Sequence, residues 1–310
     1  MSRPEQLVPG IPILEIGGTH VTAAWVDPAD WRPSGVSRHD LDSHADANGL
    51  LSVFVAACAD LDAPTGLHWG VAMPGPFDYV AGIGHFTGVG KFDALDGVDV
   101  RARLLQMMPC RPARISFIND ASAFLVGEWL AGTAQDASRC VAITLGTGVG
   151  SAFLDDGVVV DSGPDVPPSA EVHLLDYAGH PLEDWVSRRA IKRIFAERSA
   201  RSDQHGPNDL DVKEIMDLAR SGDQVAAEVV QAAFQVLGEV LGPWLKRFGA
   251  EVLVLGGSIS RSWDLIESPL RKGLSGSLEL PVRVTADAER SALIGAAYPA
   301  FIAESATPAG

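Results

Sequence analysis

The chain is an acidic polypeptide of 310 residues, in which 40 Asp and Glu against 24 Lys and Arg give a formal net charge of −16. This balance argues against nonspecific binding to nucleic acids or anionic membranes, because both depend on clustered Lys and Arg. The length is appropriate for two α/β lobes of roughly 100 to 200 residues each. The three cysteines stand apart in the sequence, so neither a Cys-x-x-Cys metal site nor a disulfide framework is indicated.

The N-terminal ten residues are polar, and no apolar run reaches the roughly 18 to 20 residues needed to span a bilayer. We therefore expect a soluble, cytoplasmic protein without a membrane partner. Only about ten residues precede the first predicted strand, which leaves no room for a helix-turn-helix module. No nucleic-acid partner is expected.

The first elements are two predicted strands, over residues 11–16 and 21–26, around a glycine cassette. Between them lie Gly17, Gly18 and Thr19. A glycine turn exposes backbone N–H groups, and the threonine hydroxyl adds a donor, so such a turn can bind a phosphate. A single turn of this kind is weak evidence, because glycine-rich hairpins are common.

Helices and strands then alternate. Helices are predicted over residues 45–61 and 98–107, and a strand over residues 67–73 ends at Pro74-Gly75-Pro76, because proline lacks the N–H that a central strand needs. Residues 79–97 form a glycine-rich stretch with little periodicity, which is typical of a shaped loop at a cleft.

A short strand over residues 114–118 leads to Asn119 and Asp120, which begin a helix that runs to about Ala131. Ligands of α/β sheets bind where strands end, so a carboxylate at position 120 can accept a hydroxyl proton. The alternative interpretation is that Asp120 merely caps the helix, because Asn and Asp are favoured caps.

The second half repeats part of this pattern. Strands are predicted over residues 141–145 and 151–154, around a second cassette that contains Gly146, Thr147 and Gly148. Two cassettes in corresponding positions suggest a duplicated fold that closes on a nucleotide from both sides. The remaining expected elements are a long excursion over residues 161–182, a core helix over Gln224–Phe248, a strand over residues 252–255 that ends at Gly256-Gly257, and a last helix over residues 290–302.

Seven motifs occur in order along the chain: Glu-Ile-Gly-Gly-Thr at 15–19, Met-Pro-Gly-Pro at 73–76, Asn-Asp-Ala at 119–121, Gly-Glu-Trp at 127–129, Leu-Gly-Thr-Gly-Val-Gly at 145–150, Leu-Gly-Gly at 255–257 and Ala-Leu-Ile-Gly-Ala-Ala at 292–297. Together they resemble the ROK family of sugar kinases, repressors and related proteins. The resemblance implies a two-lobed actin-like ATPase (ribonuclease H-like) α/β fold with a mixed sheet in each lobe and an interlobe cleft. We expect lobes at residues 1–118 plus 288–310 and at 119–287, and a homodimer.

Carried over by position, the resemblance makes Asp120 the general base, with Asn119 and Gly75 at the sugar. Glu15 stands where the family usually has Asp and can reach Mg²⁺ through water; the alternative is an ordinary surface acid. The residues implied at ATP are Gly17, Gly18, Thr19, His20, Gly146, Thr147, Gly148, Gly256 and Gly257.

The family's sugar clamp is altered in this chain. We assign Glu171, His173 and Glu183 to substrate hydroxyls, although one residue is missing between the first two relative to the family pattern. Residues 174–181 contain no cysteine, so a thiolate zinc site is excluded there and no zinc is expected. His173 with His180 can in principle bind a metal, but two histidines without further ligands are more often ordinary polar residues.

The loop before the catalytic strand departs further from the family. Thr87 stands about where the family places a sugar-binding Asn, and Lys91 follows four residues later. This lysine can meet a phosphate or a substrate, whereas the plainer interpretation is a solvated side chain.

The resemblance implies an ATP- and Mg²⁺-dependent kinase that phosphorylates a primary hydroxyl. The acceptor can be glucose, an aminosugar such as kanosamine, or a C7-cyclitol of antibiotic biosynthesis such as a valiolone. Two alternatives use the same scaffold: a sugar-sensing ROK-type regulator and an ATPase that acts on water. The acidic charge argues against the regulator, and Asn119-Asp120 favours the kinase over the ATPase.

Overall fold

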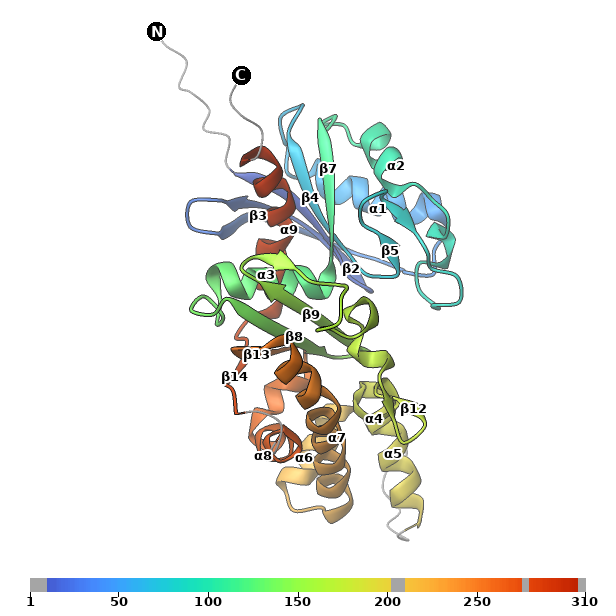
Figure 1. The fold of residues 1–310 in the computed structure, drawn as a ribbon. Helices are drawn as coiled ribbons and strands as arrows, with labels where there is room; N and C mark the ends of the chain where they lie inside the picture. Colours follow the sequence, from blue (N-terminus) through green and yellow to red (C-terminus); the bar gives the residue numbers. More distant parts are fainter. Residues whose placement is uncertain (1–9, 202–209, 275–278, 306–310) are drawn as a thin grey trace. The chain divides into compact units, whose positions relative to one another are not determined.

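The computed structural model describes residues 10–201, 210–274 and 279–305 (Figure 1). The chain divides into two compact units, one comprising Met1–Gly132 with Glu289–Gly310 and the other comprising Thr133–Ala288. The first break therefore falls after the helix that begins at Asp120, whereas the sequence placed it before this helix. The physical reason is a tight contact with the last helix of the chain, described below.

The first unit is built on a five-stranded mixed sheet in the order β3-β2-β1-β4-β7. β1 runs antiparallel to β2 and parallel to β4, which runs parallel to β7. The strands are β1 (Ile11–Ile16), β2 (His20–Asp27), β3 (Arg32–Asp40), β4 (His68–Met73) and β7 (Arg114–Asn119). Every residue of β4 is buried, as expected for a central strand that is covered on both faces. The edge strand β3 has mostly exposed polar residues, and the sequence did not predict it.

Helices pack on this sheet, together with short elements in the loop region. They are α1 (Ala47–Ala59), α2 (Val100–Met107), α3 (Asp120–Ala131), α9 (Ala288–Ser305), β5 (Phe77–Asp78), β6 (Ile83–Gly84) and a 3₁₀ turn, η1 (Asp93–Leu95). α3 and α9 approach so closely that a Cβ on Gly295 would lie 1.8 Å from the carbonyl oxygen of Ala123. A Cβ on Gly127 would similarly lie 1.9 Å from the carbonyl oxygen of Ser291. These glycines join the chain's last helix to the first unit.

The second unit repeats the strand order of the first, as β10-β9-β8-β13-β14. β8 runs antiparallel to β9 and parallel to β13, which runs parallel to β14. The strands are β8 (Arg139–Leu145), β9 (Val149–Asp155), β10 (Val158–Val159), β13 (Val252–Gly256) and β14 (Val282–Val284). The predicted mixed sheet in each half is confirmed. Each glycine cassette lies between the central strand of its sheet and that strand's antiparallel neighbour.

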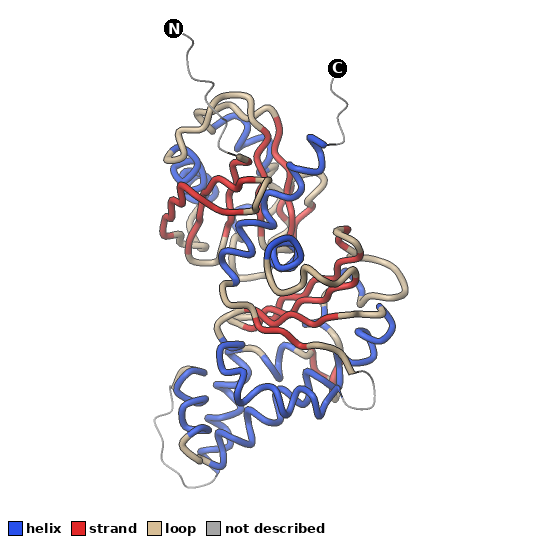
Figure 2. Tube along the Cα trace, turned by 90° about the vertical axis from the view of Figure 1, so that its left-hand side faces the viewer, coloured by secondary structure: helices blue, strands red, loops and turns tan. Residues whose placement is uncertain are grey.

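Helices form a layer beside this second sheet (Figure 2). The remaining elements are η2 (Pro168–Ala170), η3 (Val172–Leu174), β11 (Asp176–Tyr177), β12 (His180–Pro181), α4 (Glu183–Val186), α5 (Arg188–Arg201), α6 (Val212–Arg220), α7 (Gln224–Phe248), η4 (Ile259–Ser262) and α8 (Trp263–Leu274). By length and composition α7 is apolar enough to cross a membrane, which the sequence analysis did not anticipate. Its apolar face, however, is buried in the core of the second unit, as for the core helix of a soluble protein.

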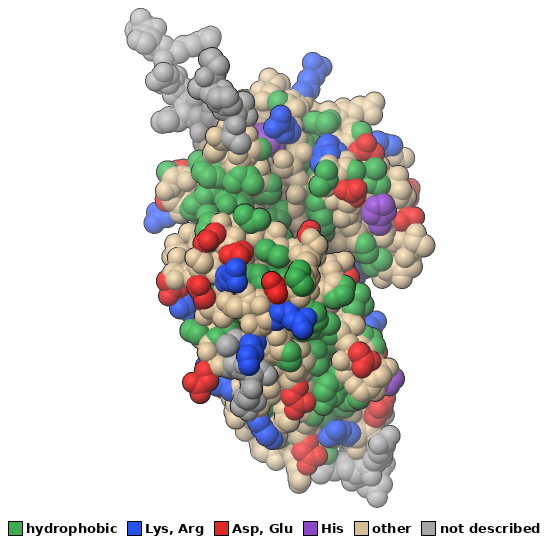
Figure 3. All heavy atoms as spheres, in the orientation of Figure 1, with side chains coloured by type: hydrophobic (Ala, Val, Ile, Leu, Met, Phe, Trp, Pro, Cys, Tyr) green, Lys and Arg blue, Asp and Glu red, His purple; other side chains and the backbone are tan. Residues whose placement is uncertain are grey.

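The cysteines and the surface charges can be compared with what the sequence predicts. All three cysteines, Cys58, Cys110 and Cys140, are buried and unpaired. On the face drawn in Figure 3, acidic and basic side chains are interspersed. This mixture does not resemble the basic stripe of a nucleic-acid-binding surface.

Candidate active site

Three parallel strands of the first sheet end at one edge and bring candidate residues together there. Glu15 pairs with Ala72 across β1 and β4, and Met73 pairs with Asn119 across β4 and β7. The chain therefore leaves the sheet at the first cassette, at Gly75 and at Asp120 along the same edge. Carboxyl ends of parallel strands are where α/β proteins bind ligands.

Asn119, and not Asp120, is the N-cap of α3. The Asn119 side-chain oxygen accepts the backbone N–H groups of Ala121, at 2.9 Å, and Ser122, at 3.1 Å. Asp120 is the first helical residue, is solvent-accessible, and accepts a hydrogen bond at 2.8 Å from the N–H of Ala121. Because the cap is already supplied, Asp120 retains carboxylate lone pairs for a ligand.

The surroundings of Asp120 disfavour its charge. Loss of hydration raises the pKa of this carboxyl above its ordinary value, while hydrogen bonds from the start of α3 and the nearby Lys91 ammonium act in the opposite direction. The net rise moves the group toward the pKa that suits a general base near neutral pH.

Tyr79 connects Asn119 to the turn after β4, a contact that the sequence analysis missed. The Asn119 amide donates to the Tyr79 hydroxyl at 2.9 Å, and this hydroxyl donates to the Met73 carbonyl at 3.2 Å. A Cβ on Gly75 would lie 3.3 Å from the same hydroxyl. The predicted residues Gly75 and Asn119 are thus neighbours, and Tyr79 fixes the amide between them.

The first cassette forms a tight hairpin, in which the N–H of Gly17 donates to the carbonyl of His20 at 2.9 Å. The Thr19 hydroxyl lies 3.2 Å from the Nδ1 atom of His20. Neither Gly17 nor Gly18 has a left-handed φ, so the turn itself does not require glycine. A Cβ on Gly18 would instead lie 3.2 Å from the Lys91 Nζ atom, which shows that the absence of a side chain keeps room for a charged group.

Glu15 is a largely buried acid with 12% of its side chain exposed. Loss of hydration, followed by the negative charges of Asp120 and Glu289, raises its pKa from 4.5 to about 8, against the favourable effect of Arg38. Its Oε2 atom is buried without a hydrogen-bond partner among the described residues, and the Nε2 atom of His20 is 4.0 Å away. The interpretation as an ordinary solvated surface acid is therefore wrong.

This environment fits a divalent cation bound with donor phosphates. Mg²⁺ typically takes only one or two protein carboxylates and keeps several waters. Within the described ranges, no three or more His, Cys, Asp and Glu side chains cluster as a metal-binding group. A lone Glu15 with an unsatisfied oxygen is consistent with a cation held mainly by phosphates and water, and inconsistent with a dedicated protein cage.

The second cassette, Gly146 to Gly148, makes a hydrogen bond within its own backbone and adjoins the carboxylate of Glu183. The N–H of Gly146 donates to the carbonyl of Gly148 at 3.0 Å, and a Cβ on Gly148 would lie 2.7 Å from the Glu183 Oε1 atom. This oxygen also accepts the Val149 N–H at 3.3 Å. Glu183, predicted to bind the sugar, is therefore attached to the hairpin predicted to bind ATP.

Gly257 brings the end of β13 against the same hairpin. It has a left-handed φ of 86°, and a Cβ there would lie 2.2 Å from the Leu145 carbonyl oxygen. Gly256 pairs with Thr144 in the register of β13 and β8. The structure thus brings Gly256 and Gly257 beside the second cassette, where both were predicted to contribute to the nucleotide site.

A cavity of about 350 Å³ next to this hairpin is lined by Thr147, Arg188, Arg189 and Lys192. The backbone N–H of Arg188 donates to the Gly146 carbonyl at 3.0 Å, which fixes the start of α5 on the cassette. The sequence analysis did not single out these cations. Arg188 is ion-paired with Asp211 at 2.6 Å and Arg189 lies 3.8 Å from the Glu183 carboxylate, so an anion in this cavity would compete with these carboxylates.

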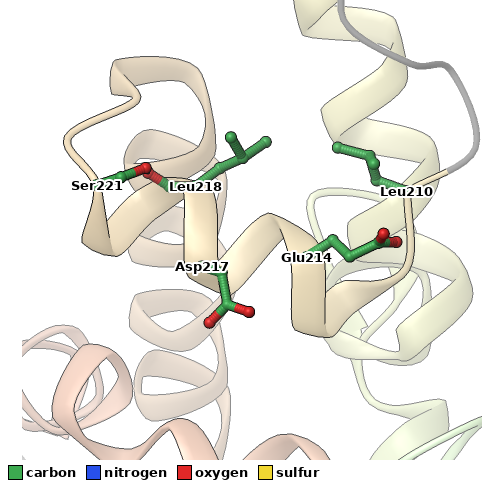
Figure 4. Close-up of a pocket in the computed structure, with 5 residues that line it drawn as sticks. All are labelled: Leu210, Glu214, Asp217, Leu218 and Ser221. Atoms are coloured by element: carbon green, nitrogen blue, oxygen red, sulfur yellow. The ribbon is translucent and has the colours of Figure 1, made fainter.

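Another cavity lies at α6, where Figure 4 shows the side chains that line it. They are Leu210, Glu214, Asp217, Leu218 and Ser221. None of the predicted site residues is among them, and the two carboxylates are unsuited to an anionic nucleotide. We therefore do not assign this cavity to the active site.

Glu171 lies between the two 3₁₀ turns η2 and η3, and His173 lies on η3. The Ser151 hydroxyl donates to the Ala170 carbonyl at 2.5 Å and accepts the Val172 N–H at 3.0 Å. This serine, which the sequence analysis missed, fixes both sides of Glu171 against β9. His180 lies on the exposed strand β12, beyond the turn that carries His173.

Comparisons with known proteins agree with this architecture. The sequence profile described as "ROK family" matches residues 13–164 and 177–300. The chain is 25% identical to a glucokinase of Thermotoga maritima, over 84% of this chain and 85% of that protein. It is also 25% identical to an N-acetylmannosamine kinase of Yersinia pseudotuberculosis, over 92% of this chain and 96% of that protein.

A solved structure gives the same result for the fold. The structure of a ROK family glucokinase from Streptomyces griseus, in complex with glucose and AMPPNP, has a TM-score of 0.72 and 22% identity and covers 94% of this chain and 99% of that chain. The predicted actin-like ATPase fold is thereby confirmed. With the family profile matching nearly the whole length, this chain belongs to the ROK family.

Proposed function

We propose that the protein is an ATP-dependent sugar kinase that transfers a γ-phosphoryl group to a primary hydroxyl of a hexose or a hexose-like acceptor. The observation that carries this proposal is the carboxylate of Asp120, released from capping by Asn119 and located at the strand-end edge that also carries the first glycine hairpin. A regulator or a structural protein has no need for a free base at this position.

In the proposed reaction Asp120 accepts the proton of the acceptor hydroxyl as its oxygen attacks phosphorus. Phosphoryl transfer requires little covalent chemistry from a protein, so positioning and electrostatic stabilisation supply most of the acceleration. The raised pKa of Asp120, which results from the surrounding protein, makes it a stronger base.

The donor phosphates would be held by the backbone N–H groups of the two hairpins and by the hydroxyls of Thr19 and Thr147. Mg²⁺ bound near Glu15 would neutralise phosphate charge. Residues Gly256 and Gly257 would contact the adenosine, beside the cavity that Thr147, Arg188, Arg189 and Lys192 line.

The acceptor would be held by Asn119 and the Gly75 turn in the first unit, and by Glu171, His173 and Glu183 in the second. Two relatives carry the names of kinases for different sugars, glucose and N-acetylmannosamine. The acceptor of this chain is therefore proposed as a class that contains glucose, aminosugars such as kanosamine and C7-cyclitols.

The first experiment replaces the proposed base. Asp120→Asn should lower kcat by about 10²- to 10⁴-fold while ATP binding is retained, because only the proton acceptor is lost. The matched control is Asp99→Asn, which alters a carboxylate that caps α2 through the Ala102 N–H and should leave kcat unchanged. A fully active Asp120→Asn variant would contradict the assignment.

The second experiment identifies the acceptor. ADP release is measured with ATP and Mg²⁺ against glucose, mannose, N-acetylated and amino hexoses, and C7-cyclitols. One acceptor should stand out in kcat/KM, because a site built for given hydroxyls discriminates against epimers that leave its polar groups unpaired. Equal rates with all acceptors and with none would favour the ATPase, and no ADP release at all would favour the regulator.

A further inference from the structure

Lys91 places an ammonium group beside the first glycine hairpin. Its Nζ atom lies 3.2 Å from the position of a Cβ on Gly18, and the Cδ and Cε atoms lie 3.8 Å from the same point. The side chain therefore extends along the turn that the proposed function assigns to the donor phosphates. The same ammonium acts electrostatically on Asp120. One cation thus adjoins both the phosphate hairpin and the proposed base.

The loop that carries Lys91 is ordered by buried anchors. Phe86 and Phe92 are almost fully buried, with ring centroids 5.6 Å apart, and the Phe92 N–H donates to the Ser43 carbonyl at 2.8 Å. The Thr87 hydroxyl donates to Asp96 at 2.7 Å, which closes the loop. These contacts hold the backbone on both sides of Lys91, and the position of its Nζ atom beside Gly18 argues against a fully solvated lysine.

Lys91 forms no close ion pair over the described ranges of the chain, where no carboxylate lies within 4.0 Å of its ammonium, although its charge acts on Asp120 from farther away. Arg38, by contrast, is paired with Glu289 at 2.5 Å. Lys91 is a half-buried residue, and its ammonium, next to Gly18, is placed to form an ion pair with an anion bound at the turn. A phosphate at that turn would supply the anion.

We propose that Lys91 is a catalytic residue that binds the transferred γ-phosphoryl group between Gly18 and Asp120. The inference rests on the proposed kinase function and adds a contact to it. As the acceptor oxygen forms its bond to phosphorus, the bond from phosphorus to the β-γ bridging oxygen breaks, the electron pair leaves with ADP, and the proton goes to Asp120. The ammonium stabilises the negative charge on the peripheral oxygens during this transfer.

The ammonium has a second effect, on the base. Because Lys91 lowers the pKa of Asp120, it keeps more of this carboxyl in the ionised form that accepts a proton. Removal of the charge should therefore move the acidic limb of the kcat/KM profile to higher pH. A residue that only supported the loop would leave this limb in place.

The test compares Lys91→Met and Lys91→Arg with the control Lys213→Met, which alters an exposed lysine on α6. Calorimetric binding of Mg-AMPPNP and Mg-ADP measures the γ-phosphate contact without an acceptor. Lys91→Met should weaken AMPPNP about 10-fold or more and ADP less than 2-fold, and Lys91→Arg should recover part of the difference. Equal weakening of both nucleotides, or of neither, would overturn the proposal.

Turnover with the identified acceptor gives the second readout. Lys91→Met should lower kcat about 10²- to 10³-fold with the acceptor KM within about 2-fold, as for loss of one group that acts on the transition state. A wild-type kcat in Lys91→Met together with an inactive Asp120→Asn would overturn the role of Lys91 alone. A wild-type chain that binds AMPPNP more tightly than ADP through Lys91 and yet phosphorylates no acceptor would give a different result. It would support the contact between Lys91 and the γ-phosphate and contradict the proposed kinase function.

Discussion

The two glycine hairpins occupy the same position in two sheets of the same strand order, yet their surroundings differ. The first hairpin adjoins Glu15, His20 and Lys91, and Asp120 lies at the same sheet edge. The second is held by backbone contacts with Gly257 and the start of α5, with Glu183 as its carboxylate neighbour. In the proposed function, strand order sets where the donor phosphates would approach, while the side chains around each hairpin would determine how they are bound.

The hairpins also differ in their length and in the reason for their glycines. The first returns from Gly17 to His20, and the second from Gly146 to Gly148. Gly18 faces a cation and Gly148 faces a carboxylate, whereas a Cβ on Gly146 would meet no atom within 4 Å. In this chain the cassette glycines keep space free for charged groups or for a ligand. Gly257, beside the second hairpin, instead combines a left-handed φ with close backbone contact.

The largest expected effect concerns Glu15, the charged member of the first hairpin. Its native pKa of about 8 lies above the ordinary 4.5, so the folded chain keeps a proton that the unfolded chain releases between these values. The free energy of unfolding should therefore fall as the pH rises from about 5 to 8. Glu15→Gln should remove on the order of 2–4 kcal/mol of this dependence in denaturant titrations.

The equivalent position at the second hairpin supplies the control. Thr144 precedes Gly146 as Glu15 precedes Gly17, and Thr144→Val should leave the pH dependence of stability unchanged. A wild-type chain whose stability is constant over this pH range would contradict the raised pKa. Release of a proton when Mg-ATP binds at pH 7, absent in Glu15→Gln, would identify this carboxyl as the one next to the cation.

An intermediate effect is expected at Glu183, the carboxylate of the second hairpin. Glu183→Gln retains an acceptor for the Val149 N–H but loses the charge that a sugar hydroxyl would meet. The acceptor KM should rise about 10-fold and the ATP KM less than about 3-fold, because a hydrogen bond to a charged group is replaced by a neutral one. Initial-rate kinetics measure both constants.

The control for this variant is Glu197→Gln, which changes an exposed carboxylate paired with Arg193 on α5. It should leave both constants at the wild-type values. Equal changes in the two KM values of Glu183→Gln would assign this residue to the nucleotide, in keeping with its contact to Gly148.

The sequence predicts the elements that are apolar and periodic, and it fails where packing or polarity decides. The central strands and the helix that begins at Asp120 follow from apolar runs and from an Asn cap. Strand β3 contains Pro33 and Gly35 and is mostly exposed, so its sequence resembles a loop. Its antiparallel pairing with β2, a long-range contact, makes it a strand.

The candidate site shows the same limit at the level of side chains. Motif spacing predicts that Asn119 and Asp120 stand at a strand end, but it does not show which of them caps the helix. Tyr79 and Lys91 lie in a stretch without periodicity, and Ser151 lies on a predicted strand whose pattern does not show its partners. The roles of all three depend on contacts made across the fold. For Lys91, the only sequence feature that pointed to a role was its position as a single lysine between Phe86 and Phe92.

The smallest expected effects come from alanine at one glycine of each hairpin. Gly146 has an ordinary φ and open space around it, so Gly146→Ala should leave the Tm within about 2 °C of the wild type. A phosphate in that space would meet the new methyl group, so the ATP KM should rise several-fold at an unchanged kcat.

Gly18→Ala should instead displace the Lys91 ammonium, 3.2 Å away, and lower kcat several-fold. If both variants change only the ATP KM, the two hairpins play equal parts in donor binding, and the difference in their charges has no bearing on the transfer step.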